Sequence, residues 1–384
     1  MTGVDQIEIR DAGLVIRPWQ AGDADAVWRA CQDPDIQRWT NVPRPYLREH
    51  AEGFVTTHTE RAWAGGGDAP LGVFDANSGE LLGAHGLISR SGHVAEIGYW
   101  VAPWARGRGV ATAATRAVAT WCLDVLGVRR LVWRAEVGNH ASRLVAERVG
   151  FRLEGVMRNA IRRPDGRLAD AWLAALLPGQ LLAATVPVDP VKAARAHTFG
   201  QPQPRLTAIT SCGAAIGLRA PGEQDLDAII AACRDPEAVR WTSVPDPYQP
   251  EDAFFFVHEY APACWLRGDA AVFAVVTAAD AYLGSMDLRL TSTHTGDVGF
   301  LIAPWARGQG YASAALRALC QWGFDALGLH RIEWRAYVGN EASRRVAERA
   351  GFTMEGLARA GCVQRGEDRD AWTGSVLRPP TGSA

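Results

Sequence analysis

The ten residues Ala-Pro-Trp-Ala-Arg-Gly-Arg-Gly-Val-Ala, at positions 102–111, return almost unchanged as Ala-Pro-Trp-Ala-Arg-Gly-Gln-Gly-Tyr-Ala at positions 303–312. A second block, residues 133–142, recurs at residues 334–343 with the same separation of 201 positions. This spacing is far longer than the roughly 20–50-residue periods of solenoid proteins. We therefore predict that the chain is a duplicated globular domain.

Composition sets the broad class of protein. The 384 residues are 48% hydrophobic and 21% charged, with a formal net charge of −2, so no basic field favours nucleic acid or a membrane surface as a partner. The cysteine count is seven, and no two of them form a C-x-x-C pair. This usage predicts reduced thiols in a cytoplasmic protein and no metal site. The sequence also indicates no signal peptide and no transmembrane span.

The duplication defines the expected domain boundaries. We predict an N-terminal domain over residues 1–179, a proline-rich linker over 180–205 and a C-terminal domain over 206–384. The prolines predict a semi-rigid linker. A short helix is expected within it, around residues 191–197.

Both glycine-containing loops have the character of a phosphate-binding turn. Each follows an apolar stretch and precedes a predicted helix, over residues 110–126 in the first copy and 311–327 in the second. Glycines let backbone N–H groups approach a pyrophosphate, and a helix N-terminus favours its negative charge. A Rossmann site requires G-x-G-x-x-G near the start of a parallel βαβ unit. Here several predicted strands precede the loop, which favours an α+β fold with a largely meandering sheet.

Four motifs in the same order in both halves resemble the GNAT acyltransferases, in particular the Rim-type branch related to ribosomal-protein N-acetyltransferases. The family's acyl-CoA motif, R/Q-x-x-G-x-G/A, is matched by Arg106, Gly109 and Ala111. The segment Ile97–Trp100 matches the branch's I-G-Y-W motif, and residues 298–301 match it loosely. An N-x-x-S motif followed by G-F is present in both halves. The resemblance implies two tandem α+β domains, each a mixed, mostly antiparallel twisted sheet flanked by helices, with a splayed groove for acyl-CoA.

The resemblance also implies a donor site in each half. The donor is acetyl-CoA, or another acyl-CoA or acyl-phosphopantetheine, and no metal is involved. Backbone N–H groups near the end of the splayed strand hold the thioester carbonyl, and an asparagine hydrogen-bonds to pantetheine. Asparagine is also a favoured helix N-cap, so the same side chain can serve both purposes. The implied donor-binding residues are Val101, Arg106, Gly107, Arg108, Gly109, Val110, Ala111 and Asn139, with Ile302, Arg307, Gly308, Gln309, Gly310, Tyr311, Ala312 and Asn340 in the second copy.

Catalytic candidates follow from the chemistry of amine acylation. Ser142 and Ser343 are implied to protonate the leaving thiolate, although a serine at this position is also typical of a helix N-terminus. An ammonium group must lose a proton before it attacks, so a general base is required. Glu96 and Asp297 are the candidates, because both copies keep an acid at the start of the strand that leads to the loop. The alternative for these two residues is a charged strand edge facing solvent.

The copies differ where an acceptor is expected to bind. His85 corresponds to Met286, with Asp287 next to it, and Glu136 corresponds to Tyr337. The candidate acceptor-binding residues are Trp39, His85, Glu136, Trp241 and Tyr337. We therefore expect the two halves to have diverged in function.

Three functions remain open from the sequence. The first is acyl transfer, most simply acetyl transfer from CoA, to the amine of a small molecule, with a peptide amine as the other possible acceptor. The second keeps this chemistry but takes the acyl group from an acyl carrier protein. The third is a CoA-binding module without catalytic activity.

Overall fold

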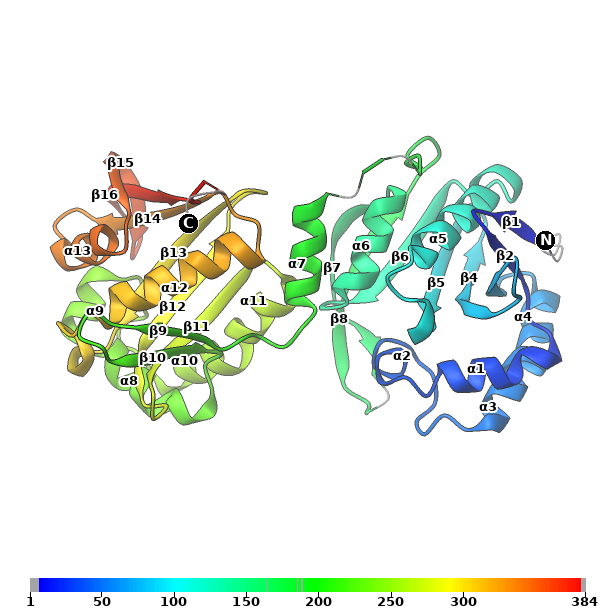
Figure 1. Ribbon diagram of the computed structural model, residues 1–384, viewed down its shortest axis with the longest axis horizontal. Helices are drawn as coiled ribbons and strands as arrows, with labels where there is room; N and C mark the ends of the chain where they lie inside the picture. Colours follow the sequence, from blue (N-terminus) through cyan, green and yellow to red (C-terminus); the bar gives the residue numbers. More distant parts are fainter. Residues whose placement is uncertain (1–6, 164, 185, 188, 381–384) are drawn as a thin grey trace. The chain divides into compact units, whose positions relative to one another are not determined.

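The computed structural model describes residues 7–163, 165–184, 186–187 and 189–380, so the outer ends of both predicted domains, 1–6 and 381–384, lie outside it. The chain divides into two compact units, Met1–Val188 and Asp189–Ala384 (Figure 1). Within the described part of the chain, no helix is both long and apolar enough to cross a membrane.

The described residues of the first unit form one sheet of eight strands, ordered β1-β2-β3-β4-β5-β6-β8-β7. All neighbouring strands are antiparallel except β5 and β6, which run parallel. The strands are β1 (Ile9–Asp11), β2 (Leu14–Pro18), β3 (Ala69–Asp75), β4 (Leu81–Ser91), β5 (Val94–Val101), β6 (Arg130–Glu136), β7 (Arg152–Arg162) and β8 (Leu168–Leu176).

Helices cover both faces of this sheet. One hydrophobic core holds Ile16 together with residues of α5 and α6, and the other holds Val15 together with residues of α1, α2 and α3. Because adjacent strand residues point to opposite faces, the unit has three layers. Its helices are α1 (Ala24–Ala30), α2 (Pro34–Trp39), α3 (Arg48–Gly53), α4 (Thr59–Gly65), α5 (Val110–Thr120) and α6 (His140–Val149), with π-helical turns at Phe54–His58 and Trp121–Val125.

The second unit repeats this plan over its described residues, with the order β9-β10-β11-β12-β13-β14-β16-β15 and one parallel pair, β13 and β14. Both units therefore have the predicted mixed, mostly antiparallel sheet. The strands are β9 (Leu206–Ile209), β10 (Ala215–Arg219), β11 (Ala270–Thr277), β12 (Tyr282–Leu290), β13 (Thr295–Ile302), β14 (Arg331–Tyr337), β15 (Thr353–Gln364) and β16 (Glu367–Leu377). The helices are α7 (Pro190–Phe199), α8 (Leu226–Cys233), α9 (Pro236–Trp241), α10 (Pro250–Phe255), α11 (Ala261–Arg267), α12 (Tyr311–Ala326) and α13 (Glu341–Arg349), with a π-helical turn at Phe256–Tyr260.

The region expected to be a linker contributes to the second unit from Asp189 onward. The short helix expected around residues 191–197 corresponds to α7, and its last residue, Phe199, is only 3% exposed within the second core. The Arg195 guanidinium donates to the Leu327 carbonyl at 2.9 Å, and the Thr198 hydroxyl donates to the Ala326 carbonyl at 3.1 Å. These contacts make α7 a packed helix of the second unit rather than a free spacer. Residues 185 and 188 of the predicted linker lie outside the described residues.

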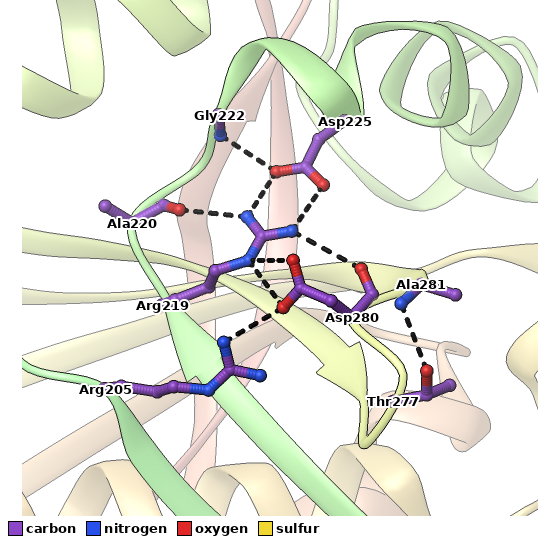
Figure 2. A network of polar contacts seen from close by, with 8 residues as sticks. All are labelled: Arg205, Arg219, Ala220, Gly222, Asp225, Thr277, Asp280 and Ala281. Carbon is purple, nitrogen blue, oxygen red and sulfur yellow. Dashed lines mark hydrogen bonds and ion pairs between the residues drawn. The ribbon is translucent and has the colours of Figure 1, made fainter.

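A buried ion pair joins the end of β10 to the segment that leads into α8. Figure 2 shows the Arg219 guanidinium between the carboxylates of Asp225 and Asp280, with Arg205 on the far side of Asp280. Arg219 binds Asp225 through two hydrogen bonds of 2.7 and 2.9 Å, and the Asp225 side chain is only 1% exposed. Asp225 also accepts a hydrogen bond from the Gly222 N–H at 2.9 Å. The pair therefore fixes the start of α8, one of the helices behind the site described below.

We expect Asp225→Ala to lower the free energy of unfolding of the second unit by about 3 kcal/mol, because it leaves the mostly buried Arg219 with only one carboxylate partner. Unfolding of a two-domain chain is not a single transition. The measurement is therefore hydrogen exchange of the full-length protein in peptides covering β10 and α8. Glu223→Ala, at an exposed position of the same turn, is the control and should change protection by less than about 0.5 kcal/mol. Equal protection in both variants would contradict this role.

Candidate active site

In each unit, two parallel strands separate halfway along their length. β5 and β6 pair from Val94–Ile97 to Arg130–Trp133, yet both strands continue, to Val101 and Glu136. The second unit repeats this, because pairing between β13 and β14 stops at Val298 and Trp334. Beyond these points the facing backbone N–H and C=O groups need other partners. An extended amide chain such as pantetheine can supply those partners as an added strand does.

The glycine loop follows the splayed strand in both units. Gly107 and Gly109 have φ of 73° and 77°, and Gly308 and Gly310 both have φ of 79°. L side chains rarely adopt this left-handed conformation, so the loop requires glycine at these positions. The helices α5 and α12 begin directly after it, at Val110 and Tyr311. The loop therefore presents backbone N–H groups and a helix N-terminus together, as anion binding requires.

The arginine of the acyl-CoA motif ties this loop to a neighbouring helix. Arg106 binds Asp33 at 2.5 Å, and Arg307 binds Asp235 at 2.6 Å. Each aspartate also caps its helix, with Asp33 accepting from the Ile36 N–H at 2.9 Å. Burial opposes ionisation of Asp33, but the hydrogen bonds from Arg106 and from backbone N–H groups, together with the charge of Arg106, outweigh it and lower the pKa of this carboxyl. In the structure these arginines thus hold the loop in place.

Both predicted asparagines are helix N-caps. The side-chain oxygen of Asn139 accepts from the Ser142 N–H at 3.2 Å, and that of Asn340 accepts from the Ser343 N–H at 3.1 Å. An asparagine amide has two further N–H donors, so capping does not prevent it from binding a ligand.

The two predicted serines have different partners. The Ser343 hydroxyl accepts a hydrogen bond from the Trp334 indole at 3.0 Å. The Ser142 hydroxyl accepts from Trp133 at 3.2 Å and donates to the Tyr99 hydroxyl at 3.1 Å. Phe300, the counterpart of Tyr99, has no hydroxyl group. The Ser142 proton is therefore already engaged with Tyr99, whereas the second unit has no such acceptor at the equivalent position.

The two carboxylates expected to act as bases are held by arginines. Arg134 binds Glu96 through two hydrogen bonds of 2.9 and 2.6 Å. Arg289 binds Asp297 through two of 2.8 and 2.5 Å. Each carboxylate is therefore engaged in a charge-assisted pair with an arginine in this structure.

A cavity of about 1280 Å³ in the second unit brings together most of the predicted residues of that half. It extends along the splayed strands to the glycine loop. Its lining includes Asp297, Ile302, Arg307, Gly308, Gly310, Tyr311, Ala312, Asn340 and Ser343, together with Trp241 and Tyr337. Gln309 instead donates its side-chain amide to the Trp305 carbonyl at 3.1 Å.

In the first unit, the candidate acceptor residues lie in other surroundings. His85 is only 3% exposed, its Nε2 lies 3.1 Å from the Thr115 hydroxyl, and its ring stacks on Tyr99. Burial lowers the pKa of His85 to about 3, so the ring is neutral at physiological pH. Glu136 is paired with Arg163. Trp39 lies under the Arg38 guanidinium, and Arg108 lies 3.9 Å from Asp75.

Asp287, which the sequence analysis noted beside Met286 but did not choose as a base, is a potential base in the structure. It lies on β12 opposite Gly299, the first residue beyond the last paired residue of β13. Its Oδ1 accepts from the Gly299 N–H at 2.8 Å, and Arg289 approaches its Oδ2 at 3.3 Å. Burial raises the pKa of the Asp287 carboxyl above its usual range, against the opposing effect of Arg289. The sequence feature that could have indicated this residue is the acid at position 287, where the equivalent position of the first copy holds Gly86.

The family model that describes the acetyltransferase (GNAT) domain matches residues 13–152 and again residues 216–353. The chain belongs to this family, and both halves are GNAT-type N-acyltransferase domains. Members of the family transfer an acyl group from CoA to an amine. Among the described residues, no group of three or more His, Cys, Asp or Glu side chains is placed to hold a metal ion.

Two relatives come from Bacillus subtilis (strain 168). The "Putative ribosomal N-acetyltransferase YdaF" is 37% identical over 89 residues, which cover 23% of this chain and 48% of that protein, so the match spans about half of the relative. The "Uncharacterized N-acetyltransferase YoaA" is 27% identical over 164 residues, covering 42% of this chain and 93% of that protein. A solved structure of RimL, a ribosomal L7/L12 alpha-N-protein acetyltransferase, is 23% identical with a TM-score of 0.41, covering 45% of this chain and 94% of that one.

The raised pKa of Asp287 predicts a pH-dependent stability effect. Its folded pKa lies above the ordinary value of 3.8, so between the two values the folded state binds more protons than the unfolded state. The free energy of unfolding therefore falls as pH rises through this window. We expect Asp287→Asn, which cannot ionise, to unfold at a higher temperature than wild type at pH 7.

Calorimetry from pH 3 to pH 8 measures this difference, which should disappear at the acidic end. Asp227→Asn, at an exposed position on α8, is the control and should show no comparable gain. A variant less stable than wild type at pH 7 would show that the ion pair with Arg289 outweighs the cost of burial.

Proposed function

We propose that this chain acetylates the amine of a small molecule with acetyl-CoA, and that the reaction takes place in the groove of the second unit. The supporting observation is the cavity that joins the glycine loop, the splayed strands and Asn340 to an aromatic end. Donor-binding and acceptor-binding surfaces are thereby continuous, as direct attack on a bound thioester requires.

The donor's groups match what the groove presents. Backbone N–H groups of Gly308 and Gly310, with the N-terminus of α12, suit the pyrophosphate. The unpaired strand edges and the Asn340 amide suit the amides of pantetheine. A backbone N–H near Ile302 is the proposed donor to the thioester oxygen, where negative charge develops in the transition state. Bound acetyl-CoA supplies an activated acyl group, and the Ser343 hydroxyl is the proposed proton source for the departing thiolate.

The lining of the cavity supports a small acceptor. Small-molecule sites are typically concave and mainly apolar, with a few well-placed polar groups. Trp241, Tyr248, Phe255, Phe256, Tyr260, Phe300 and Tyr337 all line this cavity, with Asp287 among them. A concave aromatic pocket of this kind suits a compact amine better than an extended peptide.

The first unit keeps the donor loop and the splay, so we propose that it binds donor as well. Its acceptor side differs: Ser142 is bonded to Tyr99, and Glu136 is bonded to Arg163. The duplication therefore supports two donor sites and one acceptor site.

Tryptophan substitutions at equivalent alanines of the two units test whether both units bind the donor and only the second binds the acceptor. Ala312 lines the donor end of the cavity within α12, and Ala111 is its counterpart in α5, so neither position needs a left-handed backbone. We expect calorimetric titration with acetyl-CoA to give two sites in wild type and one in each of Ala111→Trp and Ala312→Trp. Amine acetylation should be lost only in Ala312→Trp, because only that groove leads to the acceptor pocket.

Loss of acetylation in Ala111→Trp alone would place the chemistry in the first unit. Turnover only with an acetylated carrier protein, and none with free acetyl-CoA, would identify a different donor. Acetyl-CoA binding without turnover of any amine would indicate a binding module.

A further inference from the structure

Three aromatic rings form one wall of the cavity in the second unit. Phe255 ends α10, and Phe256 and Tyr260 begin and end the π-helical turn that follows. The Tyr260 ring lies 6.4 Å from that of Phe255 and 6.1 Å from that of Phe256, centroid to centroid. All three line the cavity, and Phe255 remains 51% exposed. An exposed cluster of aromatic rings beside a cavity indicates a contact surface for an apolar ligand.

The Asp287 carboxylate faces the same cavity. It lies over Gly299, where a Cβ atom would come within 2.7 Å of its Oδ1, so the missing side chain makes room for it. Its charged neighbours are Arg289 on the same strand and Asp297 on β13, and the Tyr260 hydroxyl belongs to the aromatic wall. Two carboxylates and one guanidinium leave a local excess of negative charge at this end of the cavity, which favours a cation beside Asp287. The whole lining is balanced, because it holds five acidic side chains and five arginines.

The first unit lacks the carboxylate and keeps only part of the wall. Phe54 and His58 stand at the positions of Phe256 and Tyr260, and their rings stack 5.4 Å apart. The positions of Phe255, Asp287 and Arg289 hold Gly53, Gly86 and Ile88. A Cβ at Gly98, the counterpart of Gly299, would lie 2.4 Å from the Ile88 side chain, so this isoleucine fills the space that Asp287 occupies in the second unit. The carboxylate and the exposed ring of Phe255 are therefore specific to the second groove.

The geometry points to a primary amine on an apolar or aromatic body as the acceptor, with Asp287 binding its ammonium group and taking its proton. This inference rests on the proposed acetyltransferase function of the second unit. The aromatic wall covers the apolar body of the substrate, and ring faces also attract the nearby positive charge.

The ammonium nitrogen loses two protons in the reaction, and the departing thiolate gains one. The Asp287 carboxylate accepts one proton from the ammonium group, which frees the nitrogen lone pair. The nitrogen attacks the thioester carbonyl carbon, so that a C–N bond forms and the C–S bond breaks. The second nitrogen proton leaves as the thiolate is protonated, which gives the amide and free CoA thiol. Asp287 then releases its proton to solvent.

The first experiment compares Asp287→Asn and Asp287→Glu with wild type, using acetyl-CoA and 2-phenylethylamine as probes. General-base catalysis typically contributes 10²–10⁴-fold, so we expect Asp287→Asn to lower kcat by at least about 100-fold. Asp287→Glu should recover part of the rate. The wild-type rate should rise with pH through one ionisation that is missing in Asp287→Asn, which a structural role would not produce. Acetyl-CoA binding should be unchanged in both variants.

The second experiment tests the wall. Phe255→Ala should raise KM for 2-phenylethylamine about 10-fold and leave KM for methylamine nearly unchanged, because only the larger amine reaches the ring. Phe254 is the matched control: it is adjacent on the same helix and 53% exposed, but it does not belong to the cavity lining. Phe254→Ala should leave both KM values unchanged.

The outcomes separate this inference from the function on which it rests. An Asp287→Asn variant with a wild-type rate and pH profile overturns the role of Asp287. Preference for an alanyl peptide or a polyamine such as spermidine over 2-phenylethylamine overturns the acceptor class while acetyl transfer stands. Absence of acetyl transfer to every amine tested, with acetyl-CoA still bound, overturns the proposed function itself.

Discussion

The parting of two parallel strands is the constraint on which the rest of each unit depends. β13 and β14 are held together over only four residue pairs, after which each strand is supported by its other neighbour, β12 or β16. The antiparallel strands outside the parting therefore keep the groove open. Within the groove, backbone N–H and C=O groups face a gap that an extended ligand can bridge. The glycine loop lies at the end of the same strand, so one deviation from regular pairing creates both the channel and its anion-binding end.

The separated strands keep their positions because ion pairs hold the neighbouring loop and helices in place. The loop is tied to α9 through Arg307 and Asp235, and the start of α8 is fixed by Arg219 and Asp225. The first unit repeats both ties, with Arg106 and Asp33 in one and Arg17 and Asp23 in the other. The pairs made by Arg106 and Arg307 join segments 73 and 72 residues apart, whereas those made by Arg17 and Arg219 each span six residues and hold a strand end to the start of the next helix. The donor framework is thus the same in both halves, and the differences are concentrated on the acceptor side.

The features that sequence alone predicts are those set by local backbone chemistry. Glycines with φ near 79° and asparagines capping a helix are local requirements, so the loop and both N-x-x-S motifs could be located before the structure was known. The bases were harder to predict. Glu96 and Asp297 occupy equivalent positions, yet one is held by Arg134 from the next strand and the other by Arg289 from the preceding strand. Asp287 becomes a candidate only when strand register places it opposite Gly299. Such contacts depend on which strands are neighbours and on their register, and the sequence pattern of a single strand does not encode them.

The position of Asp287 also illustrates why a functional group can be unfavourable to the fold. Arg289 is close enough to neutralise it, but this guanidinium makes its closer contacts with Asp297, at 2.8 and 2.5 Å. Asp287 is left with a contact of 3.3 Å and one backbone N–H, so its ionised form is only partly compensated. A carboxylate in that condition binds a proton more tightly than an exposed one, and a base must do so to compete for the proton of an ammonium group. The incomplete pairing that costs stability is therefore the property that makes Asp287 suited to accept a proton.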